Sequence, residues 1–331
     1  MGGESKMKMV GLALSGGAAA SAAHVGVIRA FEEAGYVITH MSGTSGGALV
    51  AGLWAAGYEN RELRGLLDRL ERRHFDVDWR RLARRRLLRQ RGEWLGFFRA
   101  SRLERWLASL TDFRIMRDLP RPVALSAVDL SRGREVIFAS RPLGDVLPPR
   151  TDGSSEDAPG HGKDGTPLEP ATERQIKDAD GAESAFRGPR GLHWEVIQEI
   201  PASLALLASS AVPVIFQPVV WKDRVFVDGG LLDNCPVAPL RALGAPAAVA
   251  VDLVSPWGWR PQRRFDGPIS ILFRSVNVIL AHQSRTAHLA ADWVIHPEIP
   301  PIAVNDFRRL GEIADAAYEW TCRTLEKQRE G

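Results

Sequence analysis

The 331-residue sequence has only two cysteines, Cys235 and Cys322, and they do not form a C-x-x-C pair. This scarcity argues against a disulfide framework and against a structural zinc site, because both need several suitably spaced cysteines. We therefore expect both cysteines to be plain thiols in a reducing compartment. The sequence implies neither a metal ion nor a cofactor.

The chain also lacks an uninterrupted apolar run that could cross a bilayer. The segment 202–221 is nearly uncharged and about long enough, but Pro213 and Pro218 interrupt it, so we expect a buried helix followed by a buried strand. Near the N-terminus, the apolar run at 9–14 is too short for a secretory signal and is better explained as a first strand. These features predict a cytoplasmic protein, with peripheral contact at a membrane as an alternative.

Hydrophobic residues make up 45% of the chain and charged residues 25%, which is enough material for a large core. Apolar runs bounded by turn residues alternate with helical patterns. This alternation predicts an α/β fold with a mainly parallel sheet buried on both faces, in a single domain over 1–331. The expected strands are Met9–Leu14, Tyr36–Met41, Val123–Asp129, Arg134–Ala139, Val225–Val227, Ala247–Leu253 and Trp293–Ile295, and the expected helices are 22–34, 48–56, 269–282 and 306–329, with further helices between 61 and 110.

Two segments have a biased composition. The segment 151–190 has nine acidic and five basic residues and hardly any large apolar ones, which predicts a disordered surface insertion. The segment 61–105 has fifteen arginines and seven acidic residues, with aromatic residues between them. We expect a basic helical cap region over 61–115, which is either a solvated helix face or a surface that binds anionic lipid headgroups. No nucleic-acid recognition motif accompanies the charge, so no nucleic acid is expected.

The pentapeptide Gly43–Gly47 has the form Gly-x-Ser-x-Gly around Ser45. It follows the expected strand Tyr36–Met41 and precedes the apolar helix-forming segment Ala48–Ala56. A strand, a sharp turn and a helix in this order are what a nucleophile elbow needs, because flanking glycines let the backbone approach closely and leave the hydroxyl exposed. The pattern predicts that Ser45 is a nucleophile.

An activated serine needs a base and a site for the developing oxyanion. Asp228 ends an apolar strand and precedes two glycines, which would place it at the edge of the sheet where ligands bind in open α/β folds; alone, an Asp-Gly-Gly is more often just a turn. The turn at Gly16, Gly17 and Ala18 joins the first strand to the first helix, so its N–H groups are candidates for the oxyanion hole, or the segment is only a tight turn. It does not fit a phosphate-binding loop.

The histidines do not complete a catalytic triad. His282 and His288 fall in an expected helix and His296 follows a strand, so none lies in a loop of the kind that a triad histidine occupies. His24 is better explained by packing or hydrogen bonding. A Ser–Asp dyad without histidine therefore fits this sequence better.

Together these motifs resemble those of the patatin-like phospholipase family. The resemblance is carried by Leu14–Gly17, Ala23–Val27, Phe31–Gly35, the elbow, Asp129–Val136, Ala208–Pro213, Val227–Gly230 and Asp233–Val237. It implies a three-layer α/β/α sandwich and hydrolysis of phospholipid or lysophospholipid esters through an acyl-enzyme. It further implies that Ser45 is the nucleophile, that Asp228 is its base, and that the N–H groups of Gly16, Gly17 and Ala18 bind the oxyanion.

The sequence departs from that family in the oxyanion segment. The family's Gly-Gly-Gly-x-Arg/Lys-Gly corresponds here to Gly16–Ser21, so Ala20 replaces the basic residue and Ser21 the last glycine. Losing one oxyanion contact costs roughly 10²–10³ in turnover. Two alternatives to a hydrolase stay open: an acyltransferase or thioesterase on the same dyad and, because of this departure, a weakly active lipid-binding or regulatory protein.

Overall fold

The structure is a computed structural model that describes residues 8–70, 100–144, 186–187, 193–254, 288–302 and 306–330, together with 271, 274–275, 278–280 and 283–284. Most of the predicted insertion at 151–190 and the central part of the basic region, 71–99, lie outside the described residues. Within the described part of the chain, no helix is long and apolar enough to cross a membrane.

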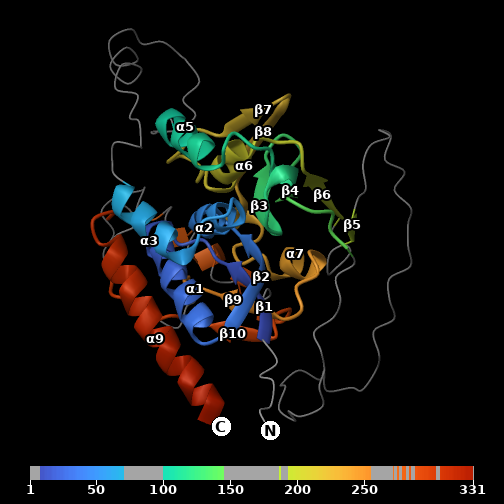
Figure 1. Cartoon of the computed structure of the whole chain (residues 1–331). Helices are drawn as coiled ribbons and strands as arrows, with labels where there is room; N and C mark the ends of the chain where they lie inside the picture. The colour runs from blue at the N-terminus through green and yellow to red at the C-terminus, as the bar shows by residue number, and fades with distance from the viewer. Residues whose placement is uncertain are drawn as a thin grey trace.

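The strands form one ten-stranded sheet, ordered β10-β9-β1-β2-β3-β4-β6-β5, with β8 pairing to β3 and β7 to β8 (Figure 1). The strands are β1 (Lys8–Leu14), β2 (Tyr36–Gly43), β3 (Val123–Asp129), β4 (Arg134–Ala139), β5 (Phe186–Arg187), β6 (His193–Ile197), β7 (Val219–Trp221), β8 (Arg224–Asp228), β9 (Ala248–Val251) and β10 (Trp293–Ile295). From β10 to β3 all neighbours are parallel, whereas β4 and β8 run antiparallel to β3. This arrangement confirms the predicted α/β fold with a mostly parallel sheet.

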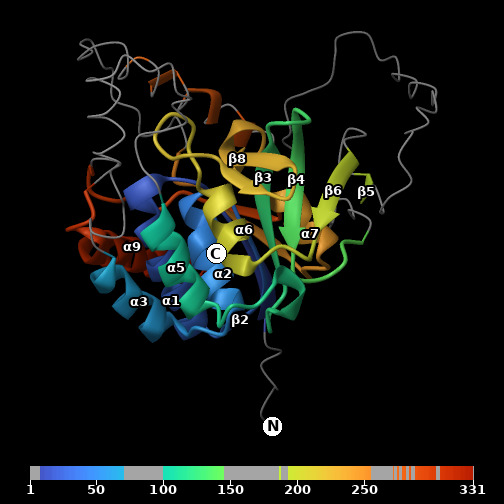
Figure 2. The same cartoon turned by 90° about the horizontal axis from the view of Figure 1, so that it is seen from above.

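Helices cover both faces of the sheet, so the domain has three layers. The helices are α1 (Ala23–Glu33), α2 (Gly46–Ala55), α3 (Asn60–Arg69), α5 (Ser101–Leu110), α6 (Ala202–Ser209), α7 (Val237–Ala242) and α9 (Leu310–Glu330). Figures 1 and 2 show α7 on one side of the sheet and the other helices on the opposite side. Side chains of β1 alternate accordingly: Leu12 and Leu14 join the larger core, and Ala13 joins the smaller core with Leu240 of α7.

The segment 202–221 differs from its prediction at one end. The helix α6 is buried as expected, but the following strand β7 lies at the edge of the sheet, where Val220 is 63% exposed. Because β7 pairs only with β8, one side of the strand has no partner strand among the described residues. An apolar composition alone therefore did not imply a fully buried strand.

The topology brings three chain segments to one edge of the sheet. The parallel strands β1 and β2 end side by side, with Leu14 opposite Gly43, so the turns that follow them are neighbours. Strand β3 extends beyond β2, and its second half pairs with β8, which places Asp228 opposite Ala127. The glycine turn, the elbow and the Asp-Gly-Gly turn therefore meet, although they are far apart in the sequence.

The close approach of α1 and α9 supplies a test of the fold. A methyl group on Gly26 would lie 1.9 Å from the carbonyl oxygen of Ala314. We expect Gly26→Ala to push the helices apart and to lower the free energy of unfolding by about 1–3 kcal/mol, measured by urea denaturation. Gly65→Ala on α3 is the matched control, since its methyl group would meet nothing within 4 Å, and it should stabilise by roughly 0.5–1 kcal/mol. Equal stability of the two variants would contradict this packing.

Candidate active site

Ser45 lies between β2 and α2. Its backbone has φ 56° and ψ −126°, a conformation that residues other than glycine rarely adopt. The glycines around it are required by space. A methyl group on Gly43 would lie 2.6 Å from the carbonyl carbon of Gly47, and one on Gly47 would lie 2.3 Å from the carbonyl oxygen of Leu14. The sharp turn expected from the Gly-x-Ser-x-Gly pattern is therefore present, and Ser45 is half-buried at its apex.

The end of α6 holds this turn in place. The N–H group of Ser45 donates to the carbonyl oxygen of Ser209 at 3.0 Å, and the hydroxyl of Ser210 donates to the carbonyl oxygen of Ser45 at 3.0 Å. The Ser209 hydroxyl in turn donates to the carbonyl oxygen of Ser126 on β3 at 2.6 Å. Ser209 and Ser210 belong to the motif Ala208–Pro213, but their role in holding the elbow was not predicted, since two adjacent hydroxyls are the only local signal for it.

Asp228 is the last residue of β8, and its side chain is buried, with only 5% of the residue exposed. Its Oδ1 accepts a hydrogen bond from the Gly230 N–H at 2.8 Å, whereas its Oδ2 is buried and has no hydrogen-bond partner among the described residues. Burial raises the pKa of Asp228 to about 6, and the Ser45 hydroxyl and the Gly230 N–H limit that rise. Asp228 is thus a stronger base than an exposed aspartate, with one oxygen uncommitted.

A buried ion pair fixes the strand that carries Asp228. Arg224, at the start of β8, donates from Nε to Asp129 Oδ2 at 2.8 Å and also binds the carboxylate of Glu195. Asp129 ends β3, so the pair joins the two strands at the end remote from Asp228. Sequence reasoning quoted Asp129 but missed Arg224 and Glu195, which belong to no local motif.

The glycine turn lies against the elbow. A methyl group on Gly16 would be 3.1 Å from Ser45 Cβ, and one on Gly46 would be 3.1 Å from the carbonyl oxygen of Ala18. The Gly16 N–H already donates to the carbonyl oxygen of Asn234 at 3.1 Å. The N–H groups of Gly17, Ala18 and Gly46 form no hydrogen bond with any residue that the structure describes. These three N–H groups are therefore uncommitted among the described residues, and Gly46 is one that the sequence did not single out.

Two further acids lie behind the Asp-Gly-Gly turn. Glu135 accepts hydrogen bonds from the Ser126 hydroxyl at 2.7 Å and from Trp194 Nε1 at 2.9 Å. Burial, together with the nearby carboxyl of Asp233, raises the pKa of Glu135 to about 8. Burial also raises the pKa of Asp233 to about 6. Both acids therefore lie in a region from which water is largely excluded.

The described histidines take no part in the site. His24 Nε2 lies 2.8 Å from the carbonyl oxygen of Ser15, which can only accept, so Nε2 carries the proton; burial lowers the pKa of His24 to about 4, and the ring is neutral. His288 Nε2 lies 3.0 Å from Asp252 Oδ2, and His296 Nδ1 lies 3.3 Å from the Asp252 carbonyl oxygen. His282 lies outside the described residues. A dyad of Ser45 and Asp228 without histidine stays a prediction.

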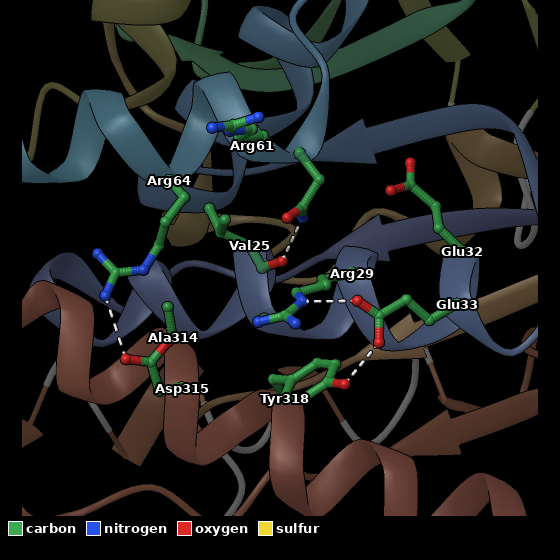
Figure 3. A pocket seen from close by; sticks show the side chains of 11 residues that line it. Val25, Arg29, Glu32, Glu33, Arg61, Arg64, Ala314, Asp315 and Tyr318 are labelled. Carbon is green, nitrogen blue, oxygen red and sulfur yellow. Dashed lines mark hydrogen bonds and ion pairs between the residues drawn. The ribbon is translucent and has the colours of Figure 1, made fainter.

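A cavity of about 410 Å³ lies elsewhere, between α1, α3 and α9. Figure 3 shows that several of its charged side chains are paired: Arg29 with Glu33, which also accepts from the Tyr318 hydroxyl, and Arg64 with Asp315. None of the residues of the elbow, the glycine turn or the Asp-Gly-Gly turn lines it. It is separate from the candidate active site.

One protein-family model and several known proteins are similar to this chain in sequence. The family model described as "Patatin-like phospholipase" matches residues 12–241. An uncharacterized NTE family protein of Mycobacterium tuberculosis is 28% identical over 244 residues, which covers 74% of this chain and 49% of that protein. Lysophospholipase nte1 of Neurospora crassa is 45% identical over 349 residues, which covers 98% of this chain and 18% of that protein. The chain spans about half or less of the length of these curated relatives.

Two solved structures are similar over almost the whole chain. VipD from Legionella pneumophila is 14% identical, with a TM-score of 0.43, covering 97% of this chain and 67% of that chain. The ExoU–SpcU complex from Pseudomonas aeruginosa is 15% identical, with a TM-score of 0.42, covering 98% of this chain and 52% of that chain. The assignment of the fold rests on the family match and on the sheet topology described above.

The raised pKa of Asp228 predicts a stability change. In the unfolded chain this aspartate has its ordinary pKa of 3.8, so the folded protein binds the proton more tightly than the unfolded chain does. This proton binding stabilises the fold at low pH, and the stabilisation is lost as the pH rises through about 6. A difference of about two pKa units corresponds to about 3 kcal/mol. We expect Asp228→Asn to raise the free energy of unfolding by up to that amount at pH 8 and to change it little below pH 4.

Asp129→Asn is the matched control, because Asp129 faces Arg224 and its charge is paired. Breaking that buried pair should lower the free energy of unfolding at pH 8 by roughly 3–5 kcal/mol. Urea denaturation of both variants at pH 4 and pH 8 checks the two signs. A destabilised Asp228→Asn at pH 8 would contradict the assignment of an unpaired buried carboxylate.

Proposed function

The chain belongs to the patatin-like phospholipase family, and from this premise we propose that it is a serine lipid acyl hydrolase in which Ser45 and Asp228 form a catalytic dyad. The observation that supports this most directly is the pairing of a strained serine at the apex of an elbow with a buried aspartate that has one uncommitted oxygen. The family match supports a lipid ester as the substrate. Phospholipids and lysophospholipids are the substrates that we propose.

In the proposed reaction, Asp228 Oδ2 accepts the proton of the Ser45 hydroxyl while Ser45 Oγ attacks the ester carbonyl carbon. The carbonyl oxygen becomes an oxyanion, which the N–H groups of Gly17, Ala18 and Gly46 stabilise. The tetrahedral intermediate then expels the alcohol, which takes the proton from Asp228. Water attacks the resulting acyl-Ser45 with Asp228 again as the base, and the fatty acid leaves as the free enzyme is restored.

The replacement of the family's basic residue by Ala20 in the oxyanion segment is relevant to the rate. Ala20 is half-buried beside Ala19 and Ser21, and it offers no charge to the oxyanion. In this proposal the three backbone N–H groups carry the stabilisation alone, so turnover is slower than in a site with a further charged donor.

An acyltransferase or thioesterase would use the same dyad with another acyl acceptor or acyl donor, and product analysis with added alcohol or lysolipid distinguishes these from a hydrolase.

Contact of the basic region with a membrane remains a prediction. Within the described part of 61–105, Arg64 pairs with Asp68 and Asp315, which favours a solvated helix face for α3. The arginine-rich centre of that region, 71–99, lies outside the described residues. The proposal of a cytoplasmic, peripherally binding enzyme therefore rests on the composition of this segment.

Replacing the nucleophile tests the proposal. We expect Ser45→Ala to lower hydrolysis of a short-chain nitrophenyl ester and of lysophosphatidylcholine by at least about 10³-fold, and to abolish labelling by a fluorophosphonate. Ser109→Ala, on the exposed face of α5, is the matched control and should be labelled like the wild type. Labelling of Ser45→Ala at the wild-type rate would refute the assigned nucleophile, and an unlabelled wild type would favour the weakly active lipid-binding alternative.

The pKa of the base predicts a pH profile. Asp228 must be ionised to accept the proton, and its pKa is raised to about 6 by burial. We expect kcat/KM for the nitrophenyl ester to fall about tenfold per pH unit below pH 6 and to level off above it. Since the pKa of Asp233 is also raised to about 6, Asp233→Asn is the control, and it should retain the same midpoint. A profile that is flat down to pH 4.5, or a midpoint that moves in Asp233→Asn, would contradict Asp228 as the base.

A further inference from the structure

Two peptide units of the turn after β1 carry N–H groups that form no hydrogen bond with any described residue. These units join Gly16 to Gly17 and Gly17 to Ala18. In a trans peptide the N–H and the C=O point in opposite directions, so a partner that holds the carbonyl group also sets the direction of the N–H group. The direction of these two donors therefore depends on the partners of the Gly16 and Gly17 carbonyl oxygens.

The two carbonyl groups are held in different ways. The Gly17 carbonyl oxygen accepts from the backbone N–H of Ala20 at 3.0 Å, a bond that does not depend on a side chain. The Gly16 carbonyl oxygen accepts from the hydroxyl of Ser15 at 3.1 Å. The orientation of the Gly16–Gly17 peptide therefore depends on a side chain.

The Ser15 hydroxyl is itself fixed. Ser15 is fully buried, and its Oγ accepts from the Leu253 N–H at 2.9 Å. An N–H group can only donate, so this bond uses a lone pair of Oγ and leaves the one hydroxyl proton for the Gly16 carbonyl oxygen. Because Leu253 follows β9, the Gly16 carbonyl group is held on the β9 side of the turn.

The order of the strands then gives the direction of the Gly17 N–H. Strand β1 lies between β9 and β2, and the elbow with Ser45 follows β2. With its carbonyl partner on the β9 side, the Gly16–Gly17 peptide directs its N–H to the side of the elbow. The two turns are close there, since a methyl group on Gly16 would lie 3.1 Å from Ser45 Cβ.

This peptide needs a restraint because glycines flank it on both sides. A glycine has no Cβ, so the rotations about Gly16 and Gly17 that reverse the peptide meet little steric resistance. The preceding peptide is fixed by other partners: the Ser15 carbonyl oxygen accepts from His24 Nε2 at 2.8 Å, and the Gly16 N–H donates to the Asn234 carbonyl oxygen at 3.1 Å. Loss of the Ser15 hydroxyl would therefore free the peptide between the two glycines.

We propose that Ser15 is a positioning residue of the oxyanion turn, whose hydroxyl fixes the Gly16–Gly17 peptide so that its N–H faces the ester carbonyl oxygen at Ser45. Ser15 does not touch the substrate and acts through this peptide. The inference rests on the proposed function, because it takes Ser45 as the nucleophile and the Gly17 N–H as an oxyanion donor. The orientation of the peptide does not depend on turnover and is observed without it.

Ser140 provides a matched control. Its buried Oγ accepts from the Val123 N–H at 2.8 Å and donates to the Arg121 carbonyl oxygen at 3.0 Å, so it has the same pair of bonds as the proposed positioning residue. The Arg121 N–H donates to the carbonyl oxygen of Ala55, the last residue of α2, whereas Ser45 precedes the first residue of that helix. Removing the Ser140 hydroxyl therefore breaks equivalent bonds at the opposite end of α2.

The kinetic test compares Ser15→Ala with Ser140→Ala in the full chain. Losing one oxyanion contact costs roughly 10²–10³ in turnover, and a freed peptide keeps that contact for part of the time. With a short-chain nitrophenyl ester we therefore expect kcat to fall at least tenfold in Ser15→Ala while KM stays within twofold. Fluorophosphonate labelling should slow at least tenfold as well, because the phosphoryl oxygen takes the place of the oxyanion. In Ser140→Ala all three quantities should stay within twofold of the wild type.

Crystal structures of both variants test the orientation without turnover. In Ser15→Ala the Gly16 carbonyl oxygen should leave its place, either fully or in a second conformer, and in Ser140→Ala it should keep that place. Urea denaturation verifies that the variants are folded. If Ser15→Ala does not fold, Ser15→Cys replaces it, because a thiol of similar size is a weaker donor.

Three outcomes would overturn the proposal: a Gly16 carbonyl group that keeps its place in Ser15→Ala, kcat and labelling in Ser15→Ala equal to those of an active wild type, or an equal loss of kcat in Ser140→Ala. The last outcome would show the effect of any lost buried hydroxyl. A wild type that neither hydrolyses the ester nor reacts with the fluorophosphonate would refute the proposed function instead, and the crystal structures would still decide whether Ser15 orients the peptide.

Discussion

The positive φ of Ser45 costs of order 1–3 kcal/mol, and the surrounding segments are arranged so that the residue cannot relax. Gly43 and Gly47 let β2 and α2 approach as closely as the turn requires, since a methyl group at either position would overlap backbone atoms. The end of α6 then bonds both the N–H and the carbonyl oxygen of Ser45. With its backbone fixed from both sides, the serine side chain stays at the edge of the sheet instead of turning into the helix.

Asp228, the proposed base, is positioned by a different means, which acts at a distance. The Arg224 and Asp129 pair lies at one end of β8, and Asp228 lies at the other. A buried ion pair adds little net stability but is costly to break, so it fixes the register of β8 on β3 more than it strengthens the fold. That register places Asp228 opposite Ala127, level with the turn that Ser209 and Ser126 support. The charged network thus sets where the carboxylate is without contacting it.

Local sequence patterns were sufficient to predict most of the fold, because they determine where the strands, the turns between them and the elbow form. Strands β3 and β4 have the bounds expected from their apolar runs and the glycine turn between them, and the Gly-x-Ser-x-Gly pattern implied the elbow. Long-range partners were not foreseeable. Nothing local to Arg224 indicates that it faces Asp129, and the engagement of the Gly16 N–H by the Asn234 carbonyl depends on a loop more than 200 residues away. The exposure of Val220 likewise depends on sheet order, which an apolar run does not encode.

The burial of Asp228 meets one requirement of the proposed chemistry. An aspartate with its ordinary pKa is a poor base for a serine hydroxyl, and the protein raises that pKa by excluding water from the carboxylate. A substrate that enters such a site must displace water without bringing its own charge to the base. In the proposed function a lipid ester meets that condition, because its acyl chain is apolar.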